Sequence, residues 1–441
     1  MNPNSIQQVV LNLVENDHRD LAWQLIDIYQ KSATTLPEFD AIGYAALKSD
    51  KRDSYLYCAE SAYALAQTSE EKFLARANLY KAYNALNQPE KALFYIQQNL
   101  EIDPNDFESL CHQAFNISLM GDKLKAEAQL EELVNKFPDR KQSLESAFAS
   151  KHLREGRTAQ GILSFIEADK PKNTLFETKL PLKKWNGIIN PGKIIYVDIE
   201  GGIGDQIINI RFFDRISSYG MTPILVSRED RYYNDTNKLF TRHGYQVITD
   251  LLEIDSTQYW APMMSLPGYM GLTENQLWQK PYLTPKQNSK NKLASDRPKI
   301  GIKCSGNPYF AQDEYRKIPL NEILEIIPND VDIYYIDKEP CNNPSVIDLA
   351  DRIESWEDTL DFIDQMDMIV SSCTSLVHAA GAMGKPTCVA VPIAEYYIWT
   401  TTKNDGSSPW YGDNFFVARQ TKVRSWKEPL NEIKMRIKTF I

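Results

Sequence analysis

The stretch KIIYVDIEGGIGDQIINIRFFDRISSYG (193–220) decides the fold class of the second half of the chain. It begins with an apolar run rich in Ile and Val, which predicts a buried β-strand. A cluster of glycines follows at once, and the remainder reads as a helix. Strand, glycine turn and helix in this order are typical of a parallel sheet with helices on both faces.

The same alternation continues toward the C-terminus. Further strands are predicted at 222–227 and 245–250 and, beyond a polar segment with prolines at 284–299, at 299–306, 332–339, 367–373 and 386–392. Helices are predicted at 319–327, 355–366, 375–383 and 426–441. The pattern therefore predicts two consecutive Rossmann-like lobes with a cleft between them, and ligands are expected at the carboxyl ends of the strands.

The first 170 residues instead repeat with a period of 34 residues. Pairs at this spacing are Asn87 and Gly121, Ala92 and Ala126, Ile96 and Leu130, and Pro104 and Pro138. Each copy predicts a helix, a tight turn, a second helix with small residues, and a proline that ends it. Weaker copies lie at 16–30, 54–67 and 155–171.

This is the tetratricopeptide (TPR) pattern, and residues 1–170 resemble that family. The resemblance implies a short solenoid of stacked helix pairs with a concave surface for a partner or a second copy of the chain. The alternative is an array that packs only against the rest of the chain. The predicted fold class is therefore α plus α/β, with a TPR-like array over 1–170, a linker over 171–193, lobes over 194–285 and 298–425, and a closing helix over 426–441.

The composition is that of a folded, acidic protein. The 441 residues are 43% hydrophobic and 24% charged, which excludes wholesale disorder. The net charge of −10 argues against a protein held to nucleic acid by charge alone. Residues 1–170 hold 18 basic and 25 acidic side chains, so most of this charge belongs to the array. Basic stretches at 170–193 and 286–317 either face phosphate or are solvated linkers.

The sequence also predicts where the protein resides. No apolar run is long enough for a membrane helix, and the N-terminus lacks a signal-peptide pattern. The six cysteines form no CxxC pair and lie apart from the histidines, so neither a zinc site nor a disulfide framework is predicted. These features predict a reduced, cytoplasmic compartment, and the abundance of Lys, Ile and Asn suits a bacterium or a phage-infected host cell.

Four motifs carry candidate chemistry, and the first is EGGIGDQ (200–206). Gly202 and Gly204 let the backbone turn sharply and approach a ligand, with Gln206 beside them. Asp205, where the strand hands over to the helix, could take a proton from an acceptor hydroxyl. The alternative is a helix cap, for which Asp is a favoured residue. The motif lacks the third glycine of a dinucleotide fingerprint.

The second motif lies at 367–392, where a strand ends and a helix begins. Thr374 and Ser375, which follow Cys373, offer N–H and hydroxyl groups suited to a pyrophosphate. His378, one turn further on, could bond a phosphate or a sugar hydroxyl. The alternative is a structural histidine.

The third motif, at 304–320, places Arg316 and Lys317 just before a helix, where two cations could neutralise a leaving diphosphate. The alternative is a pair of surface cations. Because no pair of carboxylates is evident to hold a metal, a metal-independent diphosphate site is predicted, with no cofactor.

The fourth motif is the long aromatic segment 396–420, predicted as a binding loop. Its Trp399, Trp410 and Tyr411 could stack on a base or a sugar. They could equally form a hydrophobic plug between the lobes.

Taken together, these motifs resemble the heptosyltransferase-like glycosyltransferases of family 9, and in particular those preceded by tetratricopeptide repeats. The resemblance covers about 190–422 and is carried by 200–216, 306–320, 366–386 and 399–420. It implies a GT-B fold and inverting sugar transfer from a nucleotide sugar without an essential metal.

The resemblance also implies roles for individual residues. Asp205 falls on the family's base, and Arg316 and Lys317 fall on its pyrophosphate contact. The family's phosphate motif falls on Thr374, Ser375 and His378, although Cys373 stands where the family has Asp. The positions that meet the nucleobase and ribose fall on Lys338 and Glu339.

The sequence thus predicts an inverting glycosyltransferase that acts on a nucleotide sugar. The acceptor is a glycan, a protein or a hydroxylated DNA base, as in phage DNA modification. The array is expected to position that acceptor or to form a homodimer. The alternative function is a non-catalytic TPR scaffold whose GT-B domain has decayed.

Overall fold

The computed structural model describes residues 3–16, 18–167, 182–229, 233–307, 310, 313–394 and 396–440. The chain forms two compact units. The first comprises Met1–Pro138 with the short segments Asn307–Lys317 and Thr421–Ser425. The second comprises Asp139–Gly306, Ile318–Gln420 and Trp426–Ile441.

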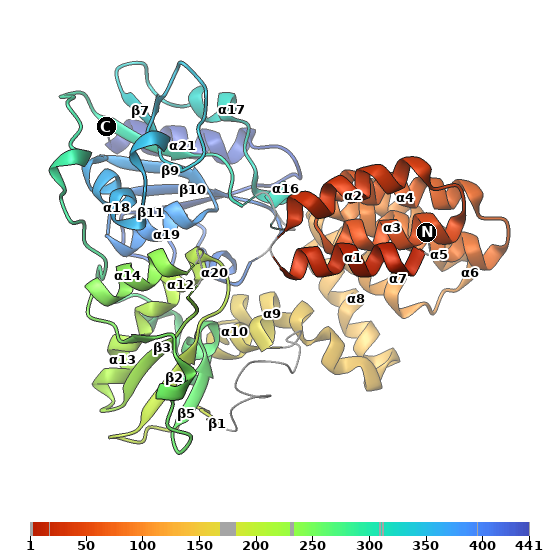
Figure 1. The fold of residues 1–441 in the computed structure, drawn as a ribbon, viewed down its shortest axis with the longest axis horizontal. Helices are drawn as coiled ribbons and strands as arrows, with labels where there is room; N and C mark the ends of the chain where they lie inside the picture. Colours follow the sequence, from red (N-terminus) through yellow and green to blue (C-terminus); the bar gives the residue numbers. More distant parts are fainter. Residues whose placement is uncertain are drawn as a thin grey trace. The chain divides into compact units, whose positions relative to one another are not determined.

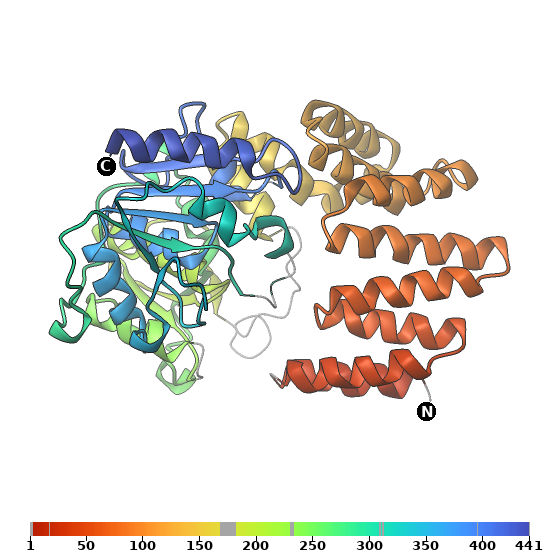
Figure 2. The same ribbon diagram turned by 90° about the horizontal axis from the view of Figure 1, so that it is seen from above.

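The first unit is a stack of helices joined by short turns, seen edge-on in Figure 2. The helices are α1 (Pro3–Glu15), α2 (Arg19–Ser32), α3 (Leu36–Lys48), α4 (Arg52–Leu65), α5 (Ser69–Ala85), α6 (Pro89–Ile102), α7 (Phe107–Leu119) and α8 (Lys123–Lys136). Small buried side chains such as Ala45, Ala62, Ala82 and Ala92 line the helix contacts, so neighbouring backbones approach closely. The predicted helical array is confirmed as helices, and its tetratricopeptide assignment stays a prediction.

The turns within the helix pairs share one backbone conformation. Asp50, Asn87 and Gly121 have φ angles of 60°, 53° and 97°, which place them in the left-handed region. Gly, Asn and Asp tolerate this region better than other residues, and it lets the chain reverse directly after a helix. The turns predicted near Asn87 and Gly121 are therefore confirmed, and Asp50 makes the equivalent turn one helix pair earlier.

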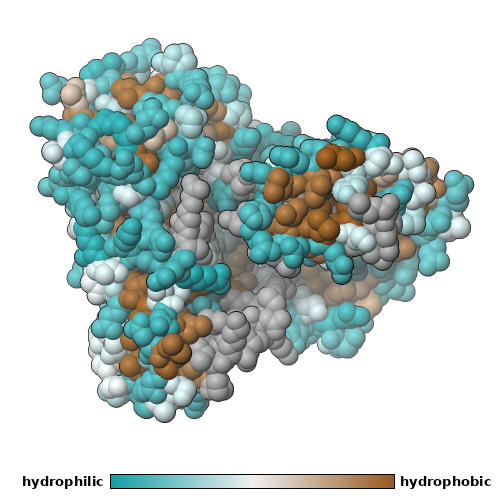
Figure 3. Space-filling model, viewed as in Figure 1, coloured by the Kyte–Doolittle hydropathy of each residue, from teal (hydrophilic) through white to brown (hydrophobic). Residues whose placement is uncertain are grey.

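Exposed apolar side chains remain on the first helices of the array. Val9 and Leu21 are each 50% exposed and Ile28 is 61% exposed. Figure 3 shows apolar residues gathered over this part of the stack. The outer surface of the terminal helices is thus less polar than a capping repeat usually is.

Two segments from the second half of the chain complete the first unit. Asn307–Lys317 includes the short helix α16 (Asp313–Arg316) and is tied to the array by the Tyr315 hydroxyl, which donates to the Asn84 carbonyl at 2.5 Å. Thr421–Ser425 is tied to it by Arg424, whose guanidinium pairs with Glu90 at 3.0 Å.

The second unit begins with the helix pair α9 (Glu145–Arg154) and α10 (Thr158–Glu167). Gly156 between them has φ 78°, so the pair continues the turn series of the array. It nevertheless packs within the second unit, where a Cβ added to Gly268 would lie 2.6 Å from Leu163 of α10. The first unit therefore ends at Pro138, earlier than the predicted boundary at 170, because this pair buries its apolar face against the first lobe.

The first lobe holds a parallel five-stranded sheet in the order β1-β5-β2-β3-β4. Its strands are β1 (Lys183–Lys184), β2 (Ile194–Asp198), β3 (Thr222–Val226), β4 (Val247–Ile248) and β5 (Tyr259–Pro262). Its helices are α12 (Ile203–Ile210), α13 (Phe212–Ser218), α14 (Asn234–Arg242) and α15 (Leu266–Tyr269), with 3-10 turns η2 (Leu251–Glu253), η3 (Met263–Ser265) and η4 (Glu274–Gln276).

The second lobe holds a parallel six-stranded sheet in the order β11-β10-β9-β6-β7-β8. Its strands are β6 (Lys299–Lys303), β7 (Asp332–Tyr335), β8 (Ile347–Asp348), β9 (Met368–Ser372), β10 (Thr387–Val391) and β11 (Phe415–Arg419). Its helices are α17 (Leu320–Leu324), α18 (Trp356–Gln365), α19 (Ser375–Ala382), α20 (Tyr397–Thr400) and α21 (Lys427–Phe440). The 3-10 turns outside the first lobe are η1 (Pro138–Leu144), η5 (Ser289–Asn291) and η6 (Ala350–Arg352).

The two lobes meet through α12 and α19, which lie side by side between the sheets (Figure 1). A single large core of buried Ile, Leu, Phe and Trp side chains runs through both lobes. The α/β class with two parallel sheets is therefore confirmed.

The chain between the lobes is fastened to α18. Asp358 closes a capping box with Ser355 at the start of this helix, and it also accepts a hydrogen bond from Asn291 at 2.9 Å. Burial opposes ionisation of this carboxyl group, but the hydrogen bonds from Asn291, Lys290 and Ser355 outweigh it and lower the pKa of Asp358 to about 2. The predicted polar linker is thus a fixed connection.

Two sequence predictions differ from the structure, and a third falls partly outside the described residues. The segment 396–420, predicted as one long loop, contains α20 and the edge strand β11, because β10 offers a parallel partner along its whole length. The strand Tyr259–Pro262 was not predicted, since its short aromatic run lacks alternation. Of the predicted linker 171–193, residues up to 181 lie outside the described part of the chain.

Candidate functional site

Asp205 lies in the first turn of α12, directly after strand β2 and the glycine turn. Gly201 adopts φ 74°, and a Cβ there would lie 2.7 Å from the Asp205 Cβ, so the turn requires glycine. The Asp205 Oδ2 accepts the Gly202 N–H at 2.9 Å. Asp205 thus caps its helix from within, as the alternative interpretation predicts, while its side chain stays partly exposed.

The second carboxylate oxygen of Asp205 is bound by a residue of the other lobe. The Tyr396 hydroxyl, from the segment between β10 and α20, donates to Oδ1 at 2.6 Å. The Tyr396 ring packs edge-on against Phe165 of α10 at 5.3 Å and against Tyr397 at 4.8 Å. Burial and the neighbouring Asp205 carboxylate raise the pKa of Tyr396 well above its ordinary value, so the phenol stays protonated and is the donor.

The start of α19 faces this carboxylate from the second lobe. Thr374 is buried at the N-cap position, with its hydroxyl 3.2 Å from that of Ser371, and Ser375 is partly exposed. The Cys373 sulfur lies 2.9 Å from the Trp399 indole nitrogen, which donates to it. The start of α19 therefore lies beside α12, since a Cβ added to Gly204 would lie 3.5 Å from the Ser375 Cα, an ordinary contact distance.

His378 is the centre of the contact between the lobes. Its side chain is 5% exposed, its Nδ1 lies 2.6 Å from the Tyr411 hydroxyl, and its ring stacks on Trp399 at 5.3 Å. A Cβ added to Gly204 would lie 2.7 Å from the His378 Cδ2. These contacts agree with the structural alternative for His378, and its predicted contact with a phosphate stays a prediction.

The aromatic residues of 396–420 form a buried plug. Trp399 is 1% exposed and stacks on Phe415 at 5.9 Å, while Trp410 is fully buried and packs edge-on against Tyr397 at 5.6 Å. Arg211 of the first lobe donates to the Trp410 carbonyl at 2.6 Å. Neither indole therefore presents a face to a ligand here, and the plug interpretation describes their surroundings.

Gln206 is also buried rather than presented to a ligand. Within the described part of the chain neither atom of its side-chain amide has a hydrogen-bond partner. A fully buried amide without hydrogen bonds is energetically costly.

The remaining predicted donor residues lie in other segments. Lys338 follows β7 and its Nζ lies 3.3 Å from Asp235 of α14, while Glu339 is exposed beside it. Arg316 and Lys317 belong to the first unit, where the Arg316 guanidinium pairs with Asp313 at 2.8 Å. The structure places Gly204, next to Asp205, against Ser375 and His378, and the donor contacts of the other residues stay predictions.

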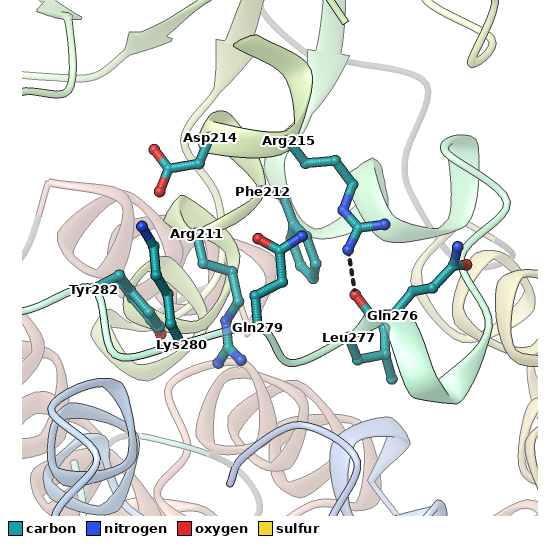
Figure 4. Close-up of a pocket in the computed structure, with 9 residues that line it drawn as sticks. All are labelled: Arg211, Phe212, Asp214, Arg215, Gln276, Leu277, Gln279, Lys280 and Tyr282. Carbon is teal, nitrogen blue, oxygen red and sulfur yellow. Dashed lines mark hydrogen bonds between the residues drawn. The ribbon is translucent and has the colours of Figure 1, made fainter. Parts of the chain in front are cut away.

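A separate small pocket lies at the opposite end of α12 from Asp205 (Figure 4). It is lined by Arg211, Phe212, Asp214, Arg215, Gln276, Leu277, Gln279, Lys280 and Tyr282. Arg215 closes one side by donating to the Gln276 carbonyl at 2.8 Å, and burial raises the pKa of Asp214 against the opposing charge of Lys280. None of the predicted site residues lines it.

The sequence interpretation missed Tyr396 and Phe165. Tyr396 belongs to the aromatic motif, but the predicted binding residues in that motif were the tryptophans, whose rings are larger stacking surfaces. Phe165 belongs to a helix that the repeat pattern assigned to the array, so no local pattern could place it against Tyr396.

The described residues offer neither a cluster of metal ligands nor a helix that could cross a membrane. No three His, Cys, Asp or Glu side chains among them converge as metal ligands would. No helix in the described ranges is both long and apolar enough to span a membrane. All six cysteines are free thiols.

Comparison with known proteins gives only distant likenesses. No protein-family model matches the chain, and no curated protein matches it. A mutant of the Thermobaculum terrenum O-GlcNAc transferase aligns with 100% of this chain and 93% of its own, at 11% identity and a TM-score of 0.41.

Two Escherichia coli structures are similar over part of the chain. The iron-containing dodecameric glycosyltransferase TibC, from an enterotoxigenic strain, aligns with 52% of this chain at 11% identity and a TM-score of 0.35, and the chain spans 62% of its length. ADP-heptose lps heptosyltransferase II aligns with 56% of this chain and 98% of its own, at 11% identity and a TM-score of 0.32. All three are glycosyltransferases by name, and at these TM-scores the likeness carries no argument for this chain.

Proposed function

We propose that the second unit is an inverting glycosyltransferase of the GT-B type that moves a sugar from a nucleotide-sugar donor to an acceptor hydroxyl. The observation that carries the proposal is the Asp205 carboxylate. It is partly exposed at the edge between two parallel-sheet lobes, where ligands of such folds bind, and both its oxygens are held by hydrogen bonds.

Asp205 is the proposed general base. A carboxylate oxygen has more than one lone pair, so a carboxylate that accepts hydrogen bonds can still take the proton of an acceptor hydroxyl. The acceptor oxygen then attacks the anomeric carbon, and the nucleoside diphosphate leaves from the opposite face. The hydrogen bonds from Gly202 and Tyr396 keep the carboxylate in a single orientation, which favours such a transfer.

The start of α19 is the proposed site for the donor diphosphate. Its N–H groups and the Ser375 hydroxyl supply hydrogen-bond donors, and the helix dipole favours negative charge there. Arg316 and Lys317 remain proposed contacts for the same diphosphate, and Lys338 and Glu339 for the nucleoside. No metal is part of the proposal, because the donors named here are amides, hydroxyls and cations.

The substitution Asp205→Asn tests the base. We expect turnover to fall about 10²-fold or more, because an amide cannot take a proton. Asp250→Asn is a matched control, since Asp250 also accepts a backbone N–H at the start of a short helix in the same lobe. Normal turnover by a natively folded Asp205→Asn variant would show that the assignment is wrong.

Binding experiments separate an enzyme from a non-catalytic scaffold. Calorimetry with UDP-, GDP-, ADP- and CMP-sugars should show micromolar to millimolar binding of one class, as enzymes of this kind usually bind their substrates. Mass spectrometry of glycans, proteins and hydroxymethylated DNA incubated with that donor then identifies the acceptor. A chain that binds no nucleotide sugar fits the scaffold instead.

A further inference from the structure

Tyr396 of the second lobe places its hydroxyl on the Asp205 carboxylate. The two residues stand far apart in the sequence, and their side chains meet at 2.6 Å. The Gly202 N–H bonds the other oxygen from within the helix itself, whereas Tyr396 reaches Asp205 from the opposite lobe. The carboxylate therefore has both of these hydrogen bonds only when the two lobes are in contact.

The Tyr396 ring is held on more than one side. Phe165 packs edge-on against it at 5.3 Å and Tyr397 at a tilt of 59°. A phenol held this firmly loses little conformational entropy when it makes its bond, so the bond is pre-formed rather than recruited. Phe165 comes from α10, so three separate segments fix one hydrogen bond.

The direction of this bond sets its chemical effect. The hydroxyl donates to the carboxylate, and a hydrogen bond to the ionised form favours that form. The hydrogen bond also occupies one side of Oδ1, and so it restricts the directions from which an acceptor hydroxyl can approach that oxygen. During transfer the acceptor O–H bond breaks, its proton passes to Asp205, the new bond to the anomeric carbon forms, and the diphosphate leaves with the electron pair of its own bond.

We infer that Tyr396 is the positioning residue of the site: it holds Asp205 ionised and oriented, and it makes the base competent only when the two lobes are apposed. This inference rests on the proposed function for its consequence in turnover, but the hydrogen bond and its effect on Asp205 do not depend on it. Tyr396 itself touches no reacting atom.

The test is a carboxyl ¹³C titration of Asp205, identified by the resonance that Asp205→Asn removes. In Tyr396→Phe we expect the titration midpoint of Asp205 to move up by about one to two pH units, since a bond to a charged acceptor is lost. Tyr397→Phe is the matched control: it removes the hydroxyl of the adjacent, buried tyrosine, which interacts with the Asn209 side chain, and it keeps the ring that packs on Tyr396. That variant should leave the midpoint unchanged.

The wild-type protein gives a second reading that needs no variant. The ¹³Cζ resonance of Tyr396 should follow the same midpoint as the Asp205 carboxyl, because the two groups share one hydrogen bond. Turnover supplies a third measurement. In Tyr396→Phe the acid limb of the pH–rate profile should move to higher pH together with the titration midpoint of Asp205. The value of kcat should fall about tenfold, with the donor KM unchanged.

The outcomes separate the two proposals. An unchanged midpoint in Tyr396→Phe, or an equal shift in both tyrosine variants, overturns the positioning role whether or not the chain is an enzyme. Absence of turnover with every nucleotide sugar overturns the proposed function, while the titration still decides the role of Tyr396.

Discussion

Gly204→Ala probes the contact on which the lobes meet. Alanine is the better helix former by about 1 kcal/mol, so in isolation this substitution would strengthen α12. In the folded chain the new Cβ would lie 2.7 Å from the His378 Cδ2, where ordinary contact begins at 3.4 Å. The helix or the ring must therefore move by about 0.7 Å to relieve the overlap.

His378 has little freedom to move. Its Nδ1 is bonded to the Tyr411 hydroxyl at 2.6 Å and its face is stacked on Trp399, within 12° of parallel. Overpacking of a rigid core costs about 1–3 kcal/mol. After the gain in helix propensity, we expect Gly204→Ala to lower the free energy of unfolding of the second unit by about 1 kcal/mol.

A double-mutant cycle with His378→Ala isolates the overlap. Once the ring is gone, Gly204→Ala should be neutral or stabilising by up to about 1 kcal/mol, which gives a coupling energy of about 1–3 kcal/mol. Urea unfolding of the four proteins, followed by tryptophan fluorescence, measures it. An equal effect of Gly204→Ala with and without the imidazole would refute the packing argument.

Three further predictions concern other parts of the chain. Asp358→Asn should lower the free energy of unfolding at pH 7 by about 1–3 kcal/mol, because it weakens bonds to a buried carboxylate. The pKa of Asp358 is about 2, below the ordinary value near 4, so its contribution is present above pH 4 and is lost toward pH 2, as urea unfolding at stepped pH should show. Tyr315→Phe should destabilise the first unit by about 1–2 kcal/mol, since it leaves the Asn84 carbonyl without its donor, and thermal unfolding should record this. Lys338→Met should change stability by less than about 1 kcal/mol, because its pair with Asp235 is exposed, yet raise the donor KM if Lys338 meets the nucleoside.

Each of these predictions has a result that contradicts it. If the free energy of unfolding still differs between Asp358→Asn and the wild type below pH 2, the ionised carboxylate is not the cause of that difference. An unchanged first unit in Tyr315→Phe would mean that water replaces the phenol without loss. An unchanged donor KM in Lys338→Met would leave this residue as a link between the lobes only.

Local patterns explain why much of the fold could be predicted. The strand and helix at 193–220 follow from the change of apolar period, and the structure places β2, α12 and α13 there. The turns at Asn87 and Gly121 follow from residue types that tolerate positive φ. The long helix predicted after the glycine turn is instead two helices, α12 and α13, separated at Arg211. The Arg211 guanidinium packs against the rings of Trp278, Tyr282 and Tyr411.

The candidate site could be predicted only in part. The turn that carries Asp205 could be predicted because its glycines are local in sequence, and a Cβ at Gly201 would meet the Asp205 side chain; the role of Asp205 as a base stays a prediction. For Trp399 and Trp410 the sequence left ligand stacking and a buried plug equally open, and both indoles are buried. A sequence records that an aromatic residue is present, whereas its burial depends on partners contributed by distant segments.

By itself the sequence determined the classes of element, their order, and the turn that carries Asp205, because backbone conformation and apolar period are properties of neighbouring residues. Only the tertiary structure decided that α9 and α10 leave the helical array for the first lobe, that His378 lies buried against Gly204, and that Tyr396 bonds Asp205. Each of these contacts depends on which apolar surfaces pack together in the folded chain. That choice is made over the whole molecule, so no local stretch of sequence records it.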